Sequence, residues 1–312
     1  MRRSALFMLG SALILGAQLV AQETTFRSGV DLVALSVVVT DGRDKFVSGL
    51  SADDFAVLED GVPQQVSFFS ATAVPMDLAL LLDTSASMID KMAVVHEAAT
   101  GFVLSAKPGD RVTVVDIKDG VRVLHPLDED LDAARAAIRT TSARGGTALY
   151  NGLYMTLKEM VRQRRSNGEV RRQAILVLSD GDDTASLVGF DDVMDVAKQS
   201  GIAIYTITLK TALQRLLAYD RHTAVSGEFA MRTLAQETGA RAFFPAQAAE
   251  LAGVYGLIAE ELASQYTLGY MSTNIVRDGA YRRVSVRVTQ PDVRTRTRTG
   301  YVASVTHPNA TR

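Results

Sequence analysis

The stretch "LALLLDTSASM", Leu78 to Met88, decides the fold of this 312-residue chain. Its near-continuous apolar run before Asp83 is typical of a strand that is buried on both faces of a parallel sheet. Two hydroxyl residues, Ser85 and Ser87, follow the aspartate two positions apart. Three roles for Asp83 fit this pattern: a catalytic carboxylate, a phosphate acceptor, or one ligand of a metal ion.

Apolar strands alternate with helical patterns from Pro75 onward. The expected strands after the first are 111–117, a short run after Gly120, 174–180, 203–209 and 241–244. Such alternation predicts a doubly wound, mostly parallel α/β domain of the Rossmann-like kind. In the strand order 3-2-1-4-5-6 the first strand lies beside the fourth, so the strand ends at Asp83 and Asp180 would share one crevice.

Both flanks of this domain are rich in strands instead. Before it, 30–41 and 54–69 have β patterns, and Asp60-Gly61 predicts a hairpin turn in the second. After it, 265–271, 281–290 and 293–301 each predict one strand. We therefore expect the α/β domain to be inserted in one β-sandwich formed by N- and C-terminal strands.

These patterns give five expected segments. They are a signal peptide (1–21), an N-terminal β segment (22–74), the α/β domain (75–262), a C-terminal β segment that pairs with the N-terminal one (263–303) and a tail (304–312).

The N-terminus "MRRSALFMLGSALILGAQLVAQ" has the layout of a secretory signal peptide. Arg2 and Arg3 precede an apolar run from Ala5 to Val20, and the small Ala21 predicts cleavage after it. The alternative is an uncleaved membrane anchor. This run is barely long enough to cross the hydrocarbon core of a bilayer, which is about 30 Å thick. Either outcome indicates export, to the periplasm or beyond. The absence of cysteine rules out disulfides and thiolate metal sites.

The overall charge argues against nucleic acid as a partner. The chain has 33 basic and 35 acidic residues, so it lacks the broad positive field of a nucleic-acid binder. A hydrophobic share of 47% is typical of a globular protein.

Oxygen donors gather at the expected strand ends. Asp83, Ser85 and Ser87 follow the first strand, Asp180 ends the fourth, and the Gly145-Gly146 loop delivers Thr147 near the same rim. Two carboxylates and three hydroxyls suit a hard cation such as Mg²⁺, with Mn²⁺ and Ca²⁺ as alternatives. Because at most two carboxylates face the ion, it stays electrophilic and favours an oxyanion from outside.

Three motifs here are similar to those of a known family. "DTSAS" (83–87), "GGTAL" (145–149) and "LSDGDD" (178–183) resemble the loops of a metal-ion-dependent adhesion site in a von Willebrand factor type A domain. The flanks "DFAVLEDGVPQQVSFF", "YTLGYM" and "RTRTGY" resemble the secreted von Willebrand factor A-related proteins common in Acidobacteria.

The resemblance implies a role for each site residue. Ser85 and Ser87 would bind the metal directly, and Thr147 directly or through water. Asp83 and Asp180 would bind it directly or through water, depending on the state of the site. The sixth position would take a carboxylate from a protein partner. The function that this implies is non-enzymatic, cation-dependent adhesion or protein–protein interaction.

Three other interpretations compete with it. An aspartic protease needs glycine where Ser85 stands. An aspartate-dependent phosphohydrolase of the haloacid dehalogenase type would use Asp83 as nucleophile in the same crevice, but it needs a second aspartate at position 85 and a lysine near the later loops. Ser87 could simply cap the helix that contains Met92.

Some polar clusters favour structural explanations. We expect Asp182 and Asp183 to lie at the solvated start of a helix or to cap it. Arginines at 162, 164, 165, 171 and 172 predict a solvated helix end, and those at 294, 296 and 298 predict protection of an edge strand. The segment 210–229 fits either a ligand-facing rim or a peripheral insertion.

Overall fold

The computed structural model describes residues 32–72, 74–167, 171–209 and 224–305. The predicted signal segment and most of the 210–229 segment lie outside these ranges. Within them, no helix combines the length and the apolar character needed to cross a membrane.

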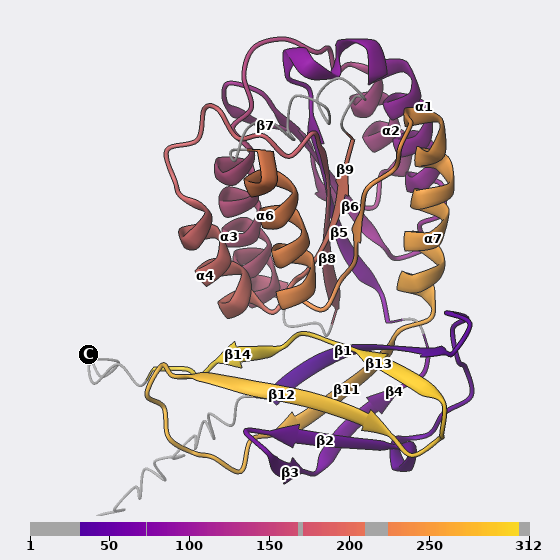
Figure 1. Cartoon of the computed structure of the whole chain (residues 1–312), viewed down its shortest axis with the longest axis vertical. Helices are drawn as coiled ribbons and strands as arrows, with labels where there is room; N and C mark the ends of the chain where they lie inside the picture. The colour runs from indigo at the N-terminus through magenta and orange to yellow at the C-terminus, as the bar shows by residue number, and fades with distance from the viewer. Residues whose placement is uncertain (1–31, 73, 168–170, 210–223, 306–312) are drawn as a thin grey trace, which may run out of the picture. The chain divides into compact units, whose positions relative to one another are not determined.

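A six-stranded sheet forms the centre of the α/β unit, in the order β10-β9-β8-β5-β6-β7 (Figure 1). Its strands are β5 (Met76–Asp83), β6 (Arg111–Ile117), β7 (Val121–Asp128), β8 (Arg172–Ser179), β9 (Ala203–Thr208) and β10 (Ala242–Phe243). Numbered from β5 along the chain, this is the predicted order 3-2-1-4-5-6. β5 pairs in parallel with both β6 and β8, and only the edge strand β7 runs antiparallel to its neighbour.

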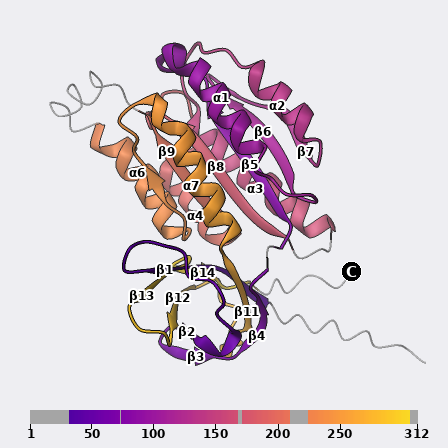
Figure 2. The same cartoon turned by 90° about the vertical axis from the view of Figure 1, so that its right-hand side faces the viewer.

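Helices cover both faces of this sheet (Figures 1 and 2). One face packs on α1 (Met92–Val103), α2 (Leu131–Arg139) and α7 (Leu251–Ala263), and the other on α3 (Leu149–Asn167), α4 (Phe190–Ser200) and α6 (Ala224–Glu237). Every residue of β5 is buried, and its side chains alternate between the two cores: Leu80 faces the first group and Leu81 the second. The doubly wound prediction is confirmed.

Two four-stranded antiparallel sheets flank the α/β unit in the sequence. One has the order β13-β1-β11-β4 and the other β14-β12-β2-β3. Their strands are β1 (Leu32–Asp41), β2 (Phe55–Glu59), β3 (Val62–Gln64), β4 (Val66–Ser70), β11 (Tyr266–Met271), β12 (Tyr281–Val288), β13 (Val293–Arg296) and β14 (Gly300–Val302). Both sheets combine strands from before and after the α/β unit, and they share one apolar core that includes Leu35, Val57 and Leu268.

The hairpin turn forms as predicted, but the strand after it is shorter than expected. Asp60 and Gly61 adopt φ values of 46° and 83° and join β2 to β3. The chain then leaves this sheet, and β4 pairs with β11 in the other one. The predicted strand 293–301 likewise divides into β13 and β14, which belong to different sheets.

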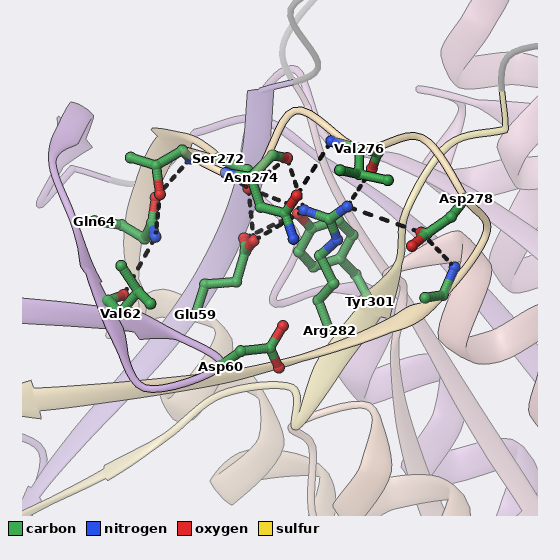
Figure 3. A network of polar contacts seen from close by, with 12 residues as sticks. Glu59, Asp60, Val62, Gln64, Ser272, Asn274, Val276, Asp278, Arg282 and Tyr301 are labelled. Carbon is green, nitrogen blue, oxygen red and sulfur yellow. Dashed lines mark hydrogen bonds and ion pairs between the residues drawn. The ribbon is translucent and has the colours of Figure 1, made fainter.

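A buried ion pair lies within the sandwich (Figure 3). Arg282 Nη1 is 3.3 Å from Glu59 Oε1, and the two side chains are 3% and 2% exposed. The hydroxyls of Tyr270 and Tyr301 donate to Glu59 Oε2 at 2.8 and 2.9 Å. Burial alone would raise the pKa of Glu59, but the hydrogen bonds from Ser272, the two tyrosines and Arg282 outweigh it and lower that pKa.

Two arginines that were expected at a solvated helix end take part in buried contacts. Arg171 Nε lies 2.6 Å from Asp77 Oδ1, and Arg111 Nη2 lies 2.8 Å from Asp77 Oδ2. Arg172 donates to the carbonyl of Leu262 at 2.8 Å. The prediction was therefore wrong for Arg171 and Arg172, because they bind groups at the start of β5 and the end of α7 that sequence spacing does not reveal.

The arginines near β13 also do more than protect an edge. β13 is an edge strand, as expected, but Arg296 Nη2 lies 2.6 Å from Glu261 Oε2 on α7. Arg298 lies beyond the strand and donates to the carbonyl of Ala34 at 3.0 Å. The three arginines consequently do not share one exposed strand face.

Candidate functional site

Asp83 is the last residue of β5 and is fully buried. Its Oδ1 accepts a hydrogen bond from the backbone N–H of Ser85 at 2.9 Å, and its Oδ2 accepts one from the Ser179 hydroxyl at 2.6 Å. Burial raises the pKa of Asp83 to about 6, against the lowering effect of these hydrogen bonds, and the charge of Asp180 raises it further. A buried carboxylate with a raised pKa is one that a nearby cation would stabilise.

The loop after β5 is tied directly to the loop that carries Thr147. The N–H of Ala86 donates to the carbonyl of Gly145 at 3.0 Å, and the N–H of Arg144 donates to the carbonyl of Thr84 at 2.8 Å. This reciprocal pair of backbone bonds fixes the "DTSAS" and "GGTAL" loops side by side.

Glycine is required at one position of the second loop. Gly145 has a φ of 72°, and a Cβ there would lie 2.1 Å from Asp119 Oδ2. Asp119 is held close because its Oδ1 accepts the N–H of Gly146 at 2.6 Å. The close approach of Asp119 thus depends on the missing side chain at 145.

The second loop is also tied to the third. The carbonyl of Thr147 accepts the N–H groups of Thr184 and Ala185 at 2.9 and 3.0 Å. In return, the N–H of Thr147 donates to Thr184 Oγ1 at 2.9 Å. Thr147 is 4% exposed, so its hydroxyl lies in the interior of the loop cluster.

The third loop closes the set. Because β8 lies beside β5, Ser179 reaches Asp83, and Asp180 follows it directly at the end of the strand. Asp180 is 3% exposed, and its Oδ1 accepts the N–H of Asp182 at 3.2 Å. Each of the three loops is therefore hydrogen-bonded to the other two.

Ser85 directly precedes a short 3₁₀ segment, η2 (Ala86–Lys91), and Ser87 lies within it. Ser85 Oγ and Ser87 Oγ are 3.0 Å apart. The rest of η2 separates Ser87 from α1, which begins at Met92 without a side-chain cap. The alternative in which Ser87 caps that helix is wrong, because Lys91 occupies the N-cap position of α1.

Asp183 does act as a cap, at a helix other than the one that follows it. Its Oδ1 accepts the N–H of Tyr150 at 3.2 Å, at the start of α3, and also the Ser186 hydroxyl at 2.6 Å. The expectation of a structural role agrees with this contact.

The donor set suits a hard divalent cation. Among the described residues there is no group of three or more His, Asp or Glu side chains placed to hold a metal ion, so a site here would depend on hydroxyl oxygens. The residues that would hold the ion are Asp83, Ser85, Ser87, Thr147 and Asp180. All five offer oxygen, the donor that Mg²⁺, Mn²⁺ and Ca²⁺ prefer.

Several supporting residues were not predicted. Thr84 donates its hydroxyl to Asp116 Oδ1 on β6, and Asp116 in turn pairs with Lys118 at 3.3 Å. An aspartate inside the apolar run "VTVVDI" was the available signal for this contact. Ser179 and the buried Lys91 gave no comparable signal, because a serine or a lysine near a strand end or helix start is common at the surface.

One cavity lies away from the candidate site. A cavity of about 790 Å³ opens in the sandwich, and its lining includes Leu58, Arg283, Ser285 and Thr297. It has no contact with the three loops of the candidate site.

The sheet order and the three joined loops define an α/β unit with oxygen donors at its carboxyl edge. Residues 78–183 match the family of the von Willebrand factor type A domain, and this range contains all five candidate site residues. No curated protein sequence matches the chain.

Solved structures show the same fold. A von Willebrand factor type A protein from Catenulispora acidiphila has a TM-score of 0.51 at 12% identity, covering 89% of this chain and 76% of that one. Proximal thread matrix protein 1 from the mussel byssus, in a structure with a zinc-occupied MIDAS motif, has a TM-score of 0.50 at 16% identity. That match covers 62% of this chain, which spans about half (49%) of the mussel protein.

Proposed function

We propose that this chain is an exported, non-enzymatic binding protein. Its α/β unit would hold a divalent cation and use it to capture a carboxylate on a partner protein. One observation carries the proposal: the three loops that bear Asp83, Thr147 and Asp180 are hydrogen-bonded to one another in every pairing. Such cross-linking would hold the five proposed oxygen donors in place before any ion arrives.

The charge of the donor set favours capture of an anion. Asp83 and Asp180 are the two carboxylates, and the other three donors are neutral hydroxyls. The charges of two carboxylates would only neutralise a divalent ion. A coordination position of that ion left open to solvent would then bind a further oxyanion. An aspartate or glutamate side chain of a partner provides this group.

The comparisons support the metal part of the proposal. The family match covers the three loops, and the mussel protein of similar fold holds zinc in its MIDAS motif. We propose Mg²⁺ as the ion, with Mn²⁺ or Ca²⁺ as alternatives that the same oxygens accept. The preference among these ions would be set by size and geometry.

Export and domain boundaries form part of the same proposal. We propose that 1–21 is a signal peptide, that the α/β domain spans 75–262, and that 22–74 and 263–303 form the sandwich. The protein would then act in the periplasm or outside the cell, where it can meet a protein ligand.

Thermal unfolding in Mg²⁺ or Mn²⁺ against EDTA tests the metal site, for the wild type and Asp180→Ala. At a hundredfold excess over Kd, a bound ion adds about 2.7 kcal/mol of stability. We expect a clear rise in Tm for the wild type and little for the variant. Equal Tm values for the wild type in EDTA and in both ions, with no heat on titration, would refute the proposal.

An assay with generic phosphate esters tests the enzymatic alternative. Metal-dependent turnover that Asp83→Asn abolishes would favour a phosphohydrolase. We expect no turnover.

A further inference from the structure

Lys91 is a buried amine beside the candidate site. It is the last residue of η2, the segment that begins directly after Ser85, and it is 7% exposed. Its Nζ donates to the carbonyl of Leu209 at 2.9 Å and lies 3.8 Å from the sulfur of Met88. The ammonium group therefore binds a backbone carbonyl in the interior.

A short path of hydrogen bonds and backbone leads from this amine to Asp83, one of the two candidate metal-binding carboxylates. Leu209, whose carbonyl binds Lys91, donates its own N–H to the carbonyl of Ser179 at 2.9 Å. Ser179 donates its hydroxyl to Asp83 at 2.6 Å, and Asp180 follows it in sequence. Lys91 is thus linked to the end of β8 through Leu209.

The electrostatic environment of Lys91 agrees with this placement. Burial lowers the pKa of the amine, and the charges of Asp180, Asp83 and Asp90 oppose that effect, in this order of size. The two carboxylates expected to bind the metal are thus the main charges that offset the effect of burial on the pKa of Lys91.

We propose that Lys91 is a built-in counter-ion of the metal site, which stabilises the two aspartates when no divalent ion is bound and weakens the binding of that ion. The inference rests on the proposed function, because it concerns the same site. Its physical basis is that a buried charge is costly unless a charge of opposite sign is near, and that two cations sharing the same carboxylates repel each other.

A purely structural role for Lys91 makes a different prediction. If the amine only satisfied the Leu209 carbonyl, a neutral donor of similar length would replace it without effect on metal affinity. Lys91→Gln keeps a donor and removes the charge, whereas Lys91→Met removes both. The pair of variants therefore separates charge from hydrogen bonding.

Calorimetric titration of the full chain with MgCl₂ tests the inference. We expect both Lys91→Gln and Lys91→Met to bind Mg²⁺ on the order of tenfold more tightly than the wild type. In EDTA both variants should have a lower Tm than the wild type, and their rise in Tm with Mg²⁺ should be larger. Lys198→Gln removes a partly exposed lysine that pairs with Glu237 and serves as the control, with an unchanged Kd at physiological salt.

The outcomes are distinguishable. A wild type that binds Mg²⁺, together with a folded Lys91→Gln variant of equal or weaker affinity, overturns the inference and leaves the proposed function intact. Absence of Mg²⁺ binding in the wild type and in all variants overturns both. Circular dichroism establishes that each variant is folded.

Discussion

Ser179 illustrates how one unpredicted side chain supports the site. Its hydroxyl donates to Asp83 and accepts the N–H of Gly181 at 3.0 Å. Sequence patterns located Asp83 and Asp180 because a carboxylate after an apolar strand is conspicuous. A serine at the end of a strand is not conspicuous in the sequence. Its contact with Asp83 depends on the pairing of two strands that are distant in sequence.

Replacing Ser179 by alanine should weaken both stability and metal binding. The change leaves one buried oxygen of Asp83 and one buried N–H without their partner, which costs about 1–3 kcal/mol. Urea unfolding measures the first effect, and titration with Mg²⁺ measures the second. Thr140→Ala removes an exposed hydroxyl that bonds only within its own helix end, and should change stability by less than about 0.5 kcal/mol. Equal losses in the two variants would contradict the prediction.

Glu59 predicts a pH dependence of stability. Its pKa is lowered in the folded protein, so its contribution is fully present above the unfolded value of about 4.3 and disappears as the pH falls through the lower folded value. Glu59→Gln should cost about 3–5 kcal/mol at neutral pH, because Arg282 loses its buried partner and keeps only the half-exposed Asp278, 3.9 Å away. Denaturant unfolding from pH 7 to pH 3 should show this difference shrinking below about pH 4. A constant difference would contradict the assignment.

The loop elements depend on backbone conformation as much as on side chains. Gly145→Ala places a side chain at a positive φ and against Asp119. We expect a loss of about 1–3 kcal/mol and weaker Mg²⁺ binding, because the second loop must move to relieve the strain. Gly120→Ala is the matched control, since its φ is not positive and a Cβ there meets nothing within 4 Å. Thermal unfolding and Mg²⁺ titration of both variants give the comparison.

The strands of the α/β unit were predictable, whereas the path of the sandwich strands was not. The apolar run Leu78–Leu82 can be buried only between two helical layers, so its place in the sheet follows from its composition. The alternating pattern at 293–301 shows which side chains face inward, but not where the chain passes from one sheet to the other. That change at Thr297–Thr299 is set by the partners of β13 and β14, which lie far away in sequence.

The site could be predicted for a related reason. The order of strands fixes which carboxyl ends are neighbours, so Asp83 and Asp180 were brought together by topology alone. The reciprocal backbone hydrogen bonds between the loops, and the contact of Lys91 with the Leu209 carbonyl, depend on loop conformations. Strand order does not determine these conformations.

At the scale of the whole molecule, the sandwich depends on both ends of the chain. β11 lies between β1 and β4, and Leu268 is fully buried in their common core. Removal of residues 264–312 should therefore leave β1 and β4 without partners and β2 with β3 alone. We expect limited proteolysis to cut the truncated chain within 32–70, while the described parts of 75–262 resist. In the full chain, 32–70 should resist as well. Protection of 32–70 after truncation would contradict the prediction.

The pairing of β1 has a consequence for the order of folding. Both of its neighbours, β11 and β13, are synthesised after the entire α/β unit, and Val33 pairs with Tyr270. Such distant contacts form slowly because a long loop must close first. β1 is thus synthesised long before its partners, and its unpaired edges must stay soluble until β11 and β13 have been made.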